Sequence, residues 1–150
     1  MADLNFILLY VEDVAASEAF YAKVFGRPAL DSSPTFAMIP AAPGVMLGLW
    51  RRDGAAPAPG APGGGEIAVT AASEADVAVT IARWQALGAH IAQPPTQMDF
   101  GFTGVALDPG GHRLRVFCPA ERGARTRRRA RLVDPVKRRR AARQVRSARA

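Results

Sequence analysis

The chain has 150 residues, 49% of them hydrophobic, which is enough for one domain with a core and excludes a wholly disordered protein. No apolar run approaches the ~18 residues of a membrane-spanning helix, and the short apolar stretch near the N-terminus meets acidic residues too soon for a signal peptide. Because Cys118 is the only cysteine, no internal disulfide can form, and we expect a protein of the reducing cytoplasm without membrane contact.

The net charge of +7 comes from the C-terminal end of the chain. Residues 1–120 contain seven basic and eleven acidic residues, whereas residues 121–150 contain thirteen basic and two acidic ones. The tail at 120–150 is mainly arginine and alanine, cannot bury a core and is predicted to be disordered. A polybasic segment can bind nucleic acid through phosphates, but no aromatic residues are interleaved with these charges. We therefore favour an extension without function over nucleic-acid association, which only this tail could support.

The first fifty residues predict a strand, a helix and three short strands. Leu4–Val11 is an apolar run rich in β-branched and aromatic residues, as in a strand. Asp13 suits the N-cap of the following helix, and Gly26 suits its left-handed C-cap. Further strands are expected at residues 29–33, 35–40 and 44–50, so that residues 1–50 form one βαβββ module.

The same pattern returns after a segment at residues 51–65 in which Gly, Pro and Ala dominate, as in a linker. A strand at Glu66–Thr70 is followed by a helix that begins after the N-cap Ser73 and ends at Gly88. Strands are then expected at residues 90–92, 103–107 and 112–118, with an interruption at Pro94 and Pro95. The repeat, at residues 66–119, predicts an α+β fold in which two βαβββ modules form a curved mixed sheet around a cavity.

Three segments carry a resemblance to a known superfamily. YVEDVAASEAFYAKVFG, EIAVTAASEADVAVTIARWQALGA and VALDPGGHRLRVF resemble corresponding units of the vicinal oxygen chelate superfamily, which includes glyoxalase I, extradiol dioxygenases and bleomycin-resistance proteins. LLYVEDVAASEAFY, LGLW and DPGGHRLRVFCP are similar, more narrowly, to phenazine-antibiotic resistance proteins of that superfamily. The resemblance covers about residues 4–119. It implies the glyoxalase/bleomycin-resistance fold and a homodimer, with cavities within one chain or across two.

The resemblance also implies four positions for the ligands of a divalent metal, on the first, fourth, fifth and eighth strands. In this chain the positions hold Phe6, Gly48, Glu66 and Arg115. Only Glu66 could coordinate a metal, Arg115 would repel one, and a catalytic metal generally needs three or more protein ligands. We therefore predict no metal, no cofactor and no catalytic residue, and an enzyme with a degenerate or non-standard metal site is the alternative.

The residues at these positions favour a binding pocket instead. Strand alternation places Phe6, Met46 and Trp50 on one wall, beside the space left by Gly48, and places Glu66 with Arg115 on the other. Such walls suit a planar aromatic ligand with a charged edge, because a stacked ring gains ~0.5–1.5 kcal/mol beyond area burial and an arginine can pair with a carboxylate. The predicted ligand-binding residues are Phe6, Phe36, Met46, Gly48, Trp50, Glu66, Met98, Phe100 and Arg115.

Each of these residues also has an ordinary structural interpretation. Phe6 and Met46 could be core residues, and Glu66 with Arg115 could be a structural ion pair. Met98 and Phe100 could belong to a packed loop. Two residues outside the set are not expected to bind the ligand. Trp84 should lie in the core, and His112 should face solvent. The functional prediction is sequestration of a planar, phenazine-like antibiotic without turnover, giving drug resistance.

Overall fold

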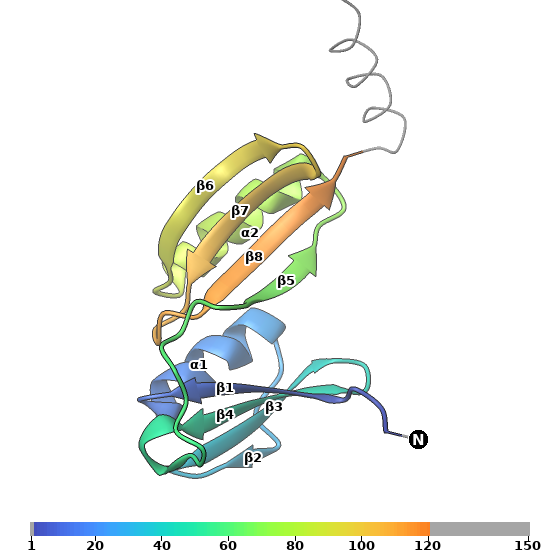
Figure 1. Cartoon of the computed structure of the whole chain (residues 1–150). Helices are drawn as coiled ribbons and strands as arrows, with labels where there is room; N and C mark the ends of the chain where they lie inside the picture. The colour runs from blue at the N-terminus through green and yellow to red at the C-terminus, as the bar shows by residue number, and fades with distance from the viewer. Residues whose placement is uncertain (1, 121–150) are drawn as a thin grey trace, which may run out of the picture.

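The computed structural model describes residues 2–120, which form two modules, each a four-stranded sheet covered on one face by a helix (Figure 1). The basic segment at 121–150, with its predicted disorder and nucleic-acid contact, lies outside the described residues. None of the helices between residues 2 and 120 is long and apolar enough to cross a membrane. The predicted α+β fold of two βαβββ modules is confirmed, with the strands in two separate mixed sheets.

The first module contains the predicted strand and helix with their caps. Its elements are β1 (Phe6–Val11), α1 (Val14–Phe25), β2 (Asp31–Ser32), β3 (Phe36–Ala42) and β4 (Val45–Arg51). The Asp13 side chain accepts a hydrogen bond from the amide of Ala16 at 2.9 Å, and Gly26 ends α1 with φ +66°. The sheet order is β1-β4-β3-β2, in which β1 and β4 are parallel and the other neighbours antiparallel.

The second module repeats this order as β5-β8-β7-β6, with β5 and β8 parallel. Its elements are β5 (Glu66–Thr70), α2 (Glu74–Ala86), β6 (His90–Met98), β7 (Gly101–Leu107) and β8 (Arg113–Pro119). Ser73 caps α2 by accepting from the amide of Asp76 at 3.1 Å. Between the modules the only regular element is a single 3-10 turn at Arg52–Gly54.

The predicted interruption at Pro94 and Pro95 is wrong, because β6 continues through both prolines to Met98. Proline lacks the amide that a central strand must donate, but β6 is the edge strand of its sheet. The pairing of β6 with β7 also shifts between Ile91 and Gln93 and again between Gln93 and Thr96. These irregularities accommodate the prolines and bend the strand.

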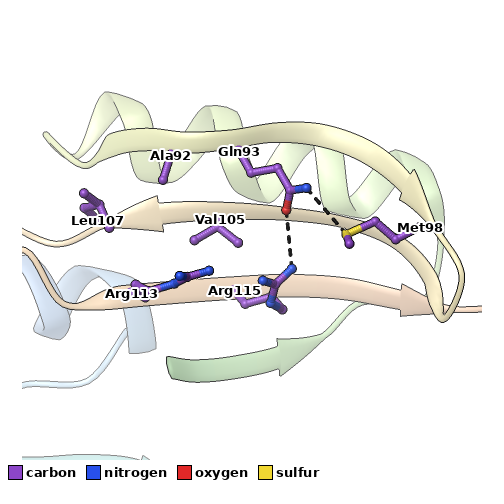
Figure 2. Close-up of a pocket in the computed structure, with 7 residues that line it drawn as sticks. All are labelled: Ala92, Gln93, Met98, Val105, Leu107, Arg113 and Arg115. Atoms are coloured by element: carbon purple, nitrogen blue, oxygen red, sulfur yellow. Dashed lines mark hydrogen bonds between the residues drawn. The ribbon is translucent and has the colours of Figure 1, made fainter. Parts of the chain in front are cut away.

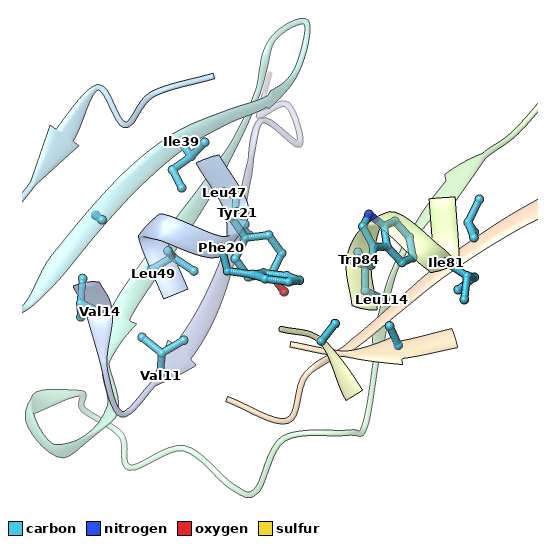
Figure 3. Close-up of a cluster of buried hydrophobic side chains, with 14 of the residues drawn as sticks. Val11, Val14, Phe20, Tyr21, Ile39, Leu47, Leu49, Ile81, Trp84 and Leu114 are labelled. Carbon is cyan, nitrogen blue, oxygen red and sulfur yellow. The ribbon is translucent and has the colours of Figure 1, made fainter. Parts of the chain in front are cut away.

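One hydrophobic core extends across both modules. Trp84 of α2 is 2% exposed, which confirms its predicted core position. Figure 3 shows Phe20 and Tyr21 of α1 at the side of the first module's cluster that is nearest Trp84. The Tyr21 hydroxyl donates to Asp108 Oδ2 at 2.6 Å, so a buried hydrogen bond joins α1 to the turn before β8.

His112 also contributes to the contact between the modules. The prediction that it faces solvent is wrong, because its ring is half-buried and Nε2 lies 3.0 Å from the Tyr10 carbonyl oxygen. The side chain of Arg83 on α2 donates to the Lys23 carbonyl of α1 at 2.5 Å. In Figure 1, α1 lies between the first sheet and the second module, so the open face of the first sheet points away from that module.

Candidate functional site

The open face of the first sheet is a continuous apolar surface, which we call the aromatic face. Strand pairing sets Phe6 beside Met46, Tyr10 beside Trp50, and Phe36 on the other side of Trp50. The alternate residues of these strands, such as Leu47 and Leu49, are buried under α1, as strand alternation requires. The aromatic face consists of Phe6, Leu8, Tyr10, Phe36, Met38, Pro40, Met46, Gly48 and Trp50.

Ring contacts organise this face into two pairs. The rings of Phe6 and Phe36 are stacked with centroids 6.5 Å apart and planes 20° apart, and those of Tyr10 and Trp50 lie 5.9 Å apart at 37°. Phe6 is 36% exposed and Leu8 41% exposed, so the interpretation of Phe6 as a core residue is wrong. A contiguous apolar surface of this kind typically marks an interaction site.

Gly48 has a different role from the one predicted. A Cβ atom at this position would overlap the ring of Phe6 and would lie 2.7 Å from Leu8 Cδ2. The space above Gly48 is therefore filled by these two side chains, and it is not an empty platform beside Trp50. Because Gly48 has no Cβ, the Phe6 ring can pack over this position, where it also stacks on the ring of Phe36.

The open face of the second sheet carries a hollow of about 430 Å³, opposite α2 (Figure 2). Its volume falls in the range of ~300–1,000 Å³ that is usual for small-molecule sites. Apolar side chains form its floor, and two arginines of β8 form one side. We call it the arginine pocket, and its lining residues are Ala92, Gln93, Met98, Val105, Leu107, Arg113 and Arg115.

A polar network holds Arg115 at the edge of this pocket. Nε lies 3.1 Å from Glu66 Oε2, and Nη2 donates to Oε1 of the same carboxylate at 3.3 Å. Nη1 donates to Thr103 Oγ1 at 3.0 Å and to Gln93 Oε1 at 3.4 Å. The Arg115 side chain is 16% exposed, and its guanidinium carbon lies 5.8 Å from the centroid of the Phe100 ring. The ion pair that the sequence suggested between Glu66 and Arg115 is therefore present.

The structure adds residues that sequence reasoning left out of the site. Arg113 lies two residues before Arg115 on the same face of β8 and lines the pocket, and its Nε lies 3.4 Å from Glu66 Oε2. Strand parity alone could have identified this residue. Gln93 could not have been found in the same way, because the shifted pairing of β6 breaks the alternation, and Thr103 depended on the register between β7 and β8.

The predicted ligand-binding residues fall into two groups. Phe6, Phe36, Met46, Gly48 and Trp50 lie on the aromatic face, and Glu66, Met98, Phe100 and Arg115 lie in or beside the arginine pocket. Within residues 2–120, no hydrogen bond, ion pair or ring contact joins a residue of one group to a residue of the other. One chain therefore presents two separate surfaces, each on its own sheet.

Residues 3–116 match the sequence model of the glyoxalase/bleomycin resistance protein/dioxygenase superfamily. The chain belongs to this superfamily. It is 29% identical over 121 residues to the phenazine antibiotic resistance protein EhpR of Enterobacter agglomerans, an alignment that covers 78% of this chain and 92% of EhpR.

Solved structures of the superfamily fold are also similar. A protein of Agrobacterium tumefaciens, solved by solution NMR, is 41% identical with a TM-score of 0.74, over 81% of this chain and all of that one. A glyoxalase-related enzyme from Fulvimarina pelagi is 25% identical with a TM-score of 0.69, over 79% of this chain and 88% of that one.

The four positions at which the superfamily resemblance implies metal ligands do not fit a metal here. Phe6 is apolar, Gly48 has no side chain, and Arg115 is a cation that is already paired with Glu66. In the part of the chain that the structure describes, no three His, Cys, Asp or Glu side chains are close enough to hold an ion. A divalent site requires several such ligands, so this donor set is unsuited to one.

Proposed function

We propose that this chain binds and sequesters a planar aromatic antibiotic of the phenazine type, without turnover, and thereby confers resistance to it. The observation that carries the proposal is the aromatic face, on which the exposed ring of Phe6 stacks on the half-buried ring of Phe36. Phe6 stands at a position where the superfamily resemblance implies a metal ligand. A flat, polarisable ligand gains both area burial and offset stacking on such a surface. The resemblance to EhpR, whose name records phenazine resistance, supports the same ligand class.

A single open face is an incomplete site for a planar ligand. A ring stacked on the aromatic face would expose its other side to water, whereas small-molecule sites typically bury ~70–90% of the ligand surface. Because α1 covers the opposite side of this sheet, the second module of the same chain does not face it. We therefore propose a homodimer in which the arginine pocket of one copy covers the aromatic face of the other, giving two equivalent sites.

Tryptophan fluorescence tests the ligand and its location together. Trp50 lies on the aromatic face, whereas Trp84 is buried in the core and serves as an internal reference. Titration with phenazine should quench the Trp50 component, and Trp50→Ala should raise the Kd, measured by equilibrium dialysis, about tenfold. Val79→Ala, on the exposed side of α2, is the matched control and should bind as the wild type does.

Two results would contradict this function. If Trp50→Ala bound phenazine with the wild-type Kd, the aromatic face would not be the binding surface. If purified protein contained stoichiometric metal and consumed the ligand, the chain would be an enzyme with a non-standard metal site. The dialysis samples answer both questions when product analysis and elemental analysis are added.

A further inference from the structure

The charges in the arginine pocket do not balance. Arg113 and Arg115 are the charged residues that line it, and both share the single carboxylate of Glu66. These three groups together carry one net positive charge at neutral pH. A buried or half-buried charge without a matching partner costs free energy, and a ligand of opposite charge would remove that cost.

Of the two arginines, Arg115 already has its partners. All three of its guanidinium nitrogens make hydrogen bonds, to Glu66, Thr103 and Gln93. Thr103 is itself fully buried and donates to the Val116 carbonyl at 2.9 Å, which fixes this end of the network. Arg115 is therefore a positioning residue that shapes the pocket and holds Glu66 in place.

Arg113 is incompletely bonded. Within residues 2–120 its buried Nε has no hydrogen-bond partner, although Glu66 Oε2 lies 3.4 Å away in an ion pair. The rest of the side chain is accessible, with 41% of its surface exposed, and Figure 2 shows it extended along the pocket beside Leu107 and Val105. Guanidinium groups bind carboxylates with two parallel hydrogen bonds, and Arg113 has such donors available.

We propose that the ligand is a planar aromatic monocarboxylate and that Arg113 binds its carboxylate. The inference rests on the proposed function and narrows its ligand class. The ring system packs on the apolar floor formed by Val105, Leu107 and Met98. Arg113, at the rim, donates hydrogen bonds to the carboxylate at the edge of the ring system. A single carboxylate balances the single excess charge, whereas a neutral ring leaves Arg113 with only its shared ion pair to Glu66.

Three probes with the same ring system test the inference: phenazine, phenazine-1-carboxamide and phenazine-1-carboxylate. Wild-type protein should bind the carboxylate about tenfold more tightly than the carboxamide, which has nearly the same shape. Arg113→Gln should reduce this preference to about one. Arg27→Gln, on an exposed position after α1, is the matched control and should retain the preference.

Two further measurements keep the test informative if Arg113→Gln folds poorly. Glu66→Gln removes the competing carboxylate, so the preference for the carboxylate probe should increase. In the wild type, added salt should weaken binding of the carboxylate and leave phenazine binding nearly unchanged.

The outcomes separate this inference from the function on which it rests. Equal affinity of wild type for the carboxylate and the carboxamide, or a preference retained in Arg113→Gln, would overturn the inference while phenazine binding still supported sequestration. If the wild-type protein bound none of the three probes, both would be overturned.

Discussion

Removing one oxygen atom, in Tyr21→Phe, tests whether the two modules are held together by their buried polar contact. The Tyr21 side chain is fully buried, and its hydroxyl donates to Asp108 Oδ2 at 2.6 Å. Asp108 Oδ1 accepts from the amides of Gly110 and His112, at 2.9 and 2.8 Å. Oδ2 thus receives its hydrogen bond from Tyr21, while Oδ1 has the two amides. Asp108 is only 4% exposed, so water does not readily replace the hydroxyl.

The expected cost follows from that geometry. A hydrogen bond to a charged group typically contributes ~1.5–3 kcal/mol, and losing the donor leaves a buried carboxylate oxygen without it. The free energy of unfolding should therefore fall by about 2 kcal/mol, which for a chain of this length corresponds to a decrease in Tm of roughly 4–8 °C. The phenyl ring still fills the core, so the cavity contribution is small.

Urea unfolding followed by circular dichroism measures the change, with calorimetry for Tm. Tyr10→Phe is the matched control, because the Tyr10 ring lies on the open aromatic face and is not part of the buried network. Its unfolding free energy should stay within about 0.5 kcal/mol of the wild type. A loss below 0.5 kcal/mol for Tyr21→Phe as well would refute the claim that this bond fastens α1 to the second module.

Two further predictions concern pH and Gly48. Burial, and then the Asp108 carboxylate, raise the pKa of Tyr21 above its usual range, so the contribution of the phenol to stability is present below about pH 10 and declines as the pH rises further. The stability difference between wild type and Tyr21→Phe should therefore narrow above about pH 10, and a constant difference from pH 7 to 11 would count against it. Gly48→Ala should displace the Phe6 ring, cost about 1–3 kcal/mol and weaken phenazine binding. Gly54→Ala is the control, because an added Cβ there meets nothing within 4 Å, and it should change neither the stability nor phenazine binding.

Much of the fold was predictable because local signals agree along the chain. Asp13 and Ser73 each cap the helix that follows, and the same order of elements appears twice. Strand alternation correctly placed Phe6 and Trp50 on one face and Arg115 on another. These features depend on residues that are close in sequence. A repeat of apolar residues every two positions indicates a strand, and a repeat every 3.6 positions indicates a helix.

The remaining features depend on contacts between distant residues. The course of β6 through Pro94 depends on its place at the sheet edge, and the filled space above Gly48 depends on which way the Phe6 ring turns. The contact between the two modules includes the hydrogen bond of Tyr21 to Asp108, which are far apart in the sequence. No periodic pattern records such contacts, so the separation of the two candidate surfaces could not be read from the sequence.

Whether those surfaces meet across two copies can be measured directly by subunit complementation. Trp50→Ala damages the aromatic face, and Ala92→Trp fills the arginine pocket from an exposed position, so each variant alone should bind phenazine weakly. In an equimolar mixture, half of the dimers should be mixed, and each of these should contain one intact site. Equilibrium dialysis should then recover about a quarter of the wild-type binding sites. No recovery, in a mixture shown to contain mixed dimers, would contradict a site shared between copies.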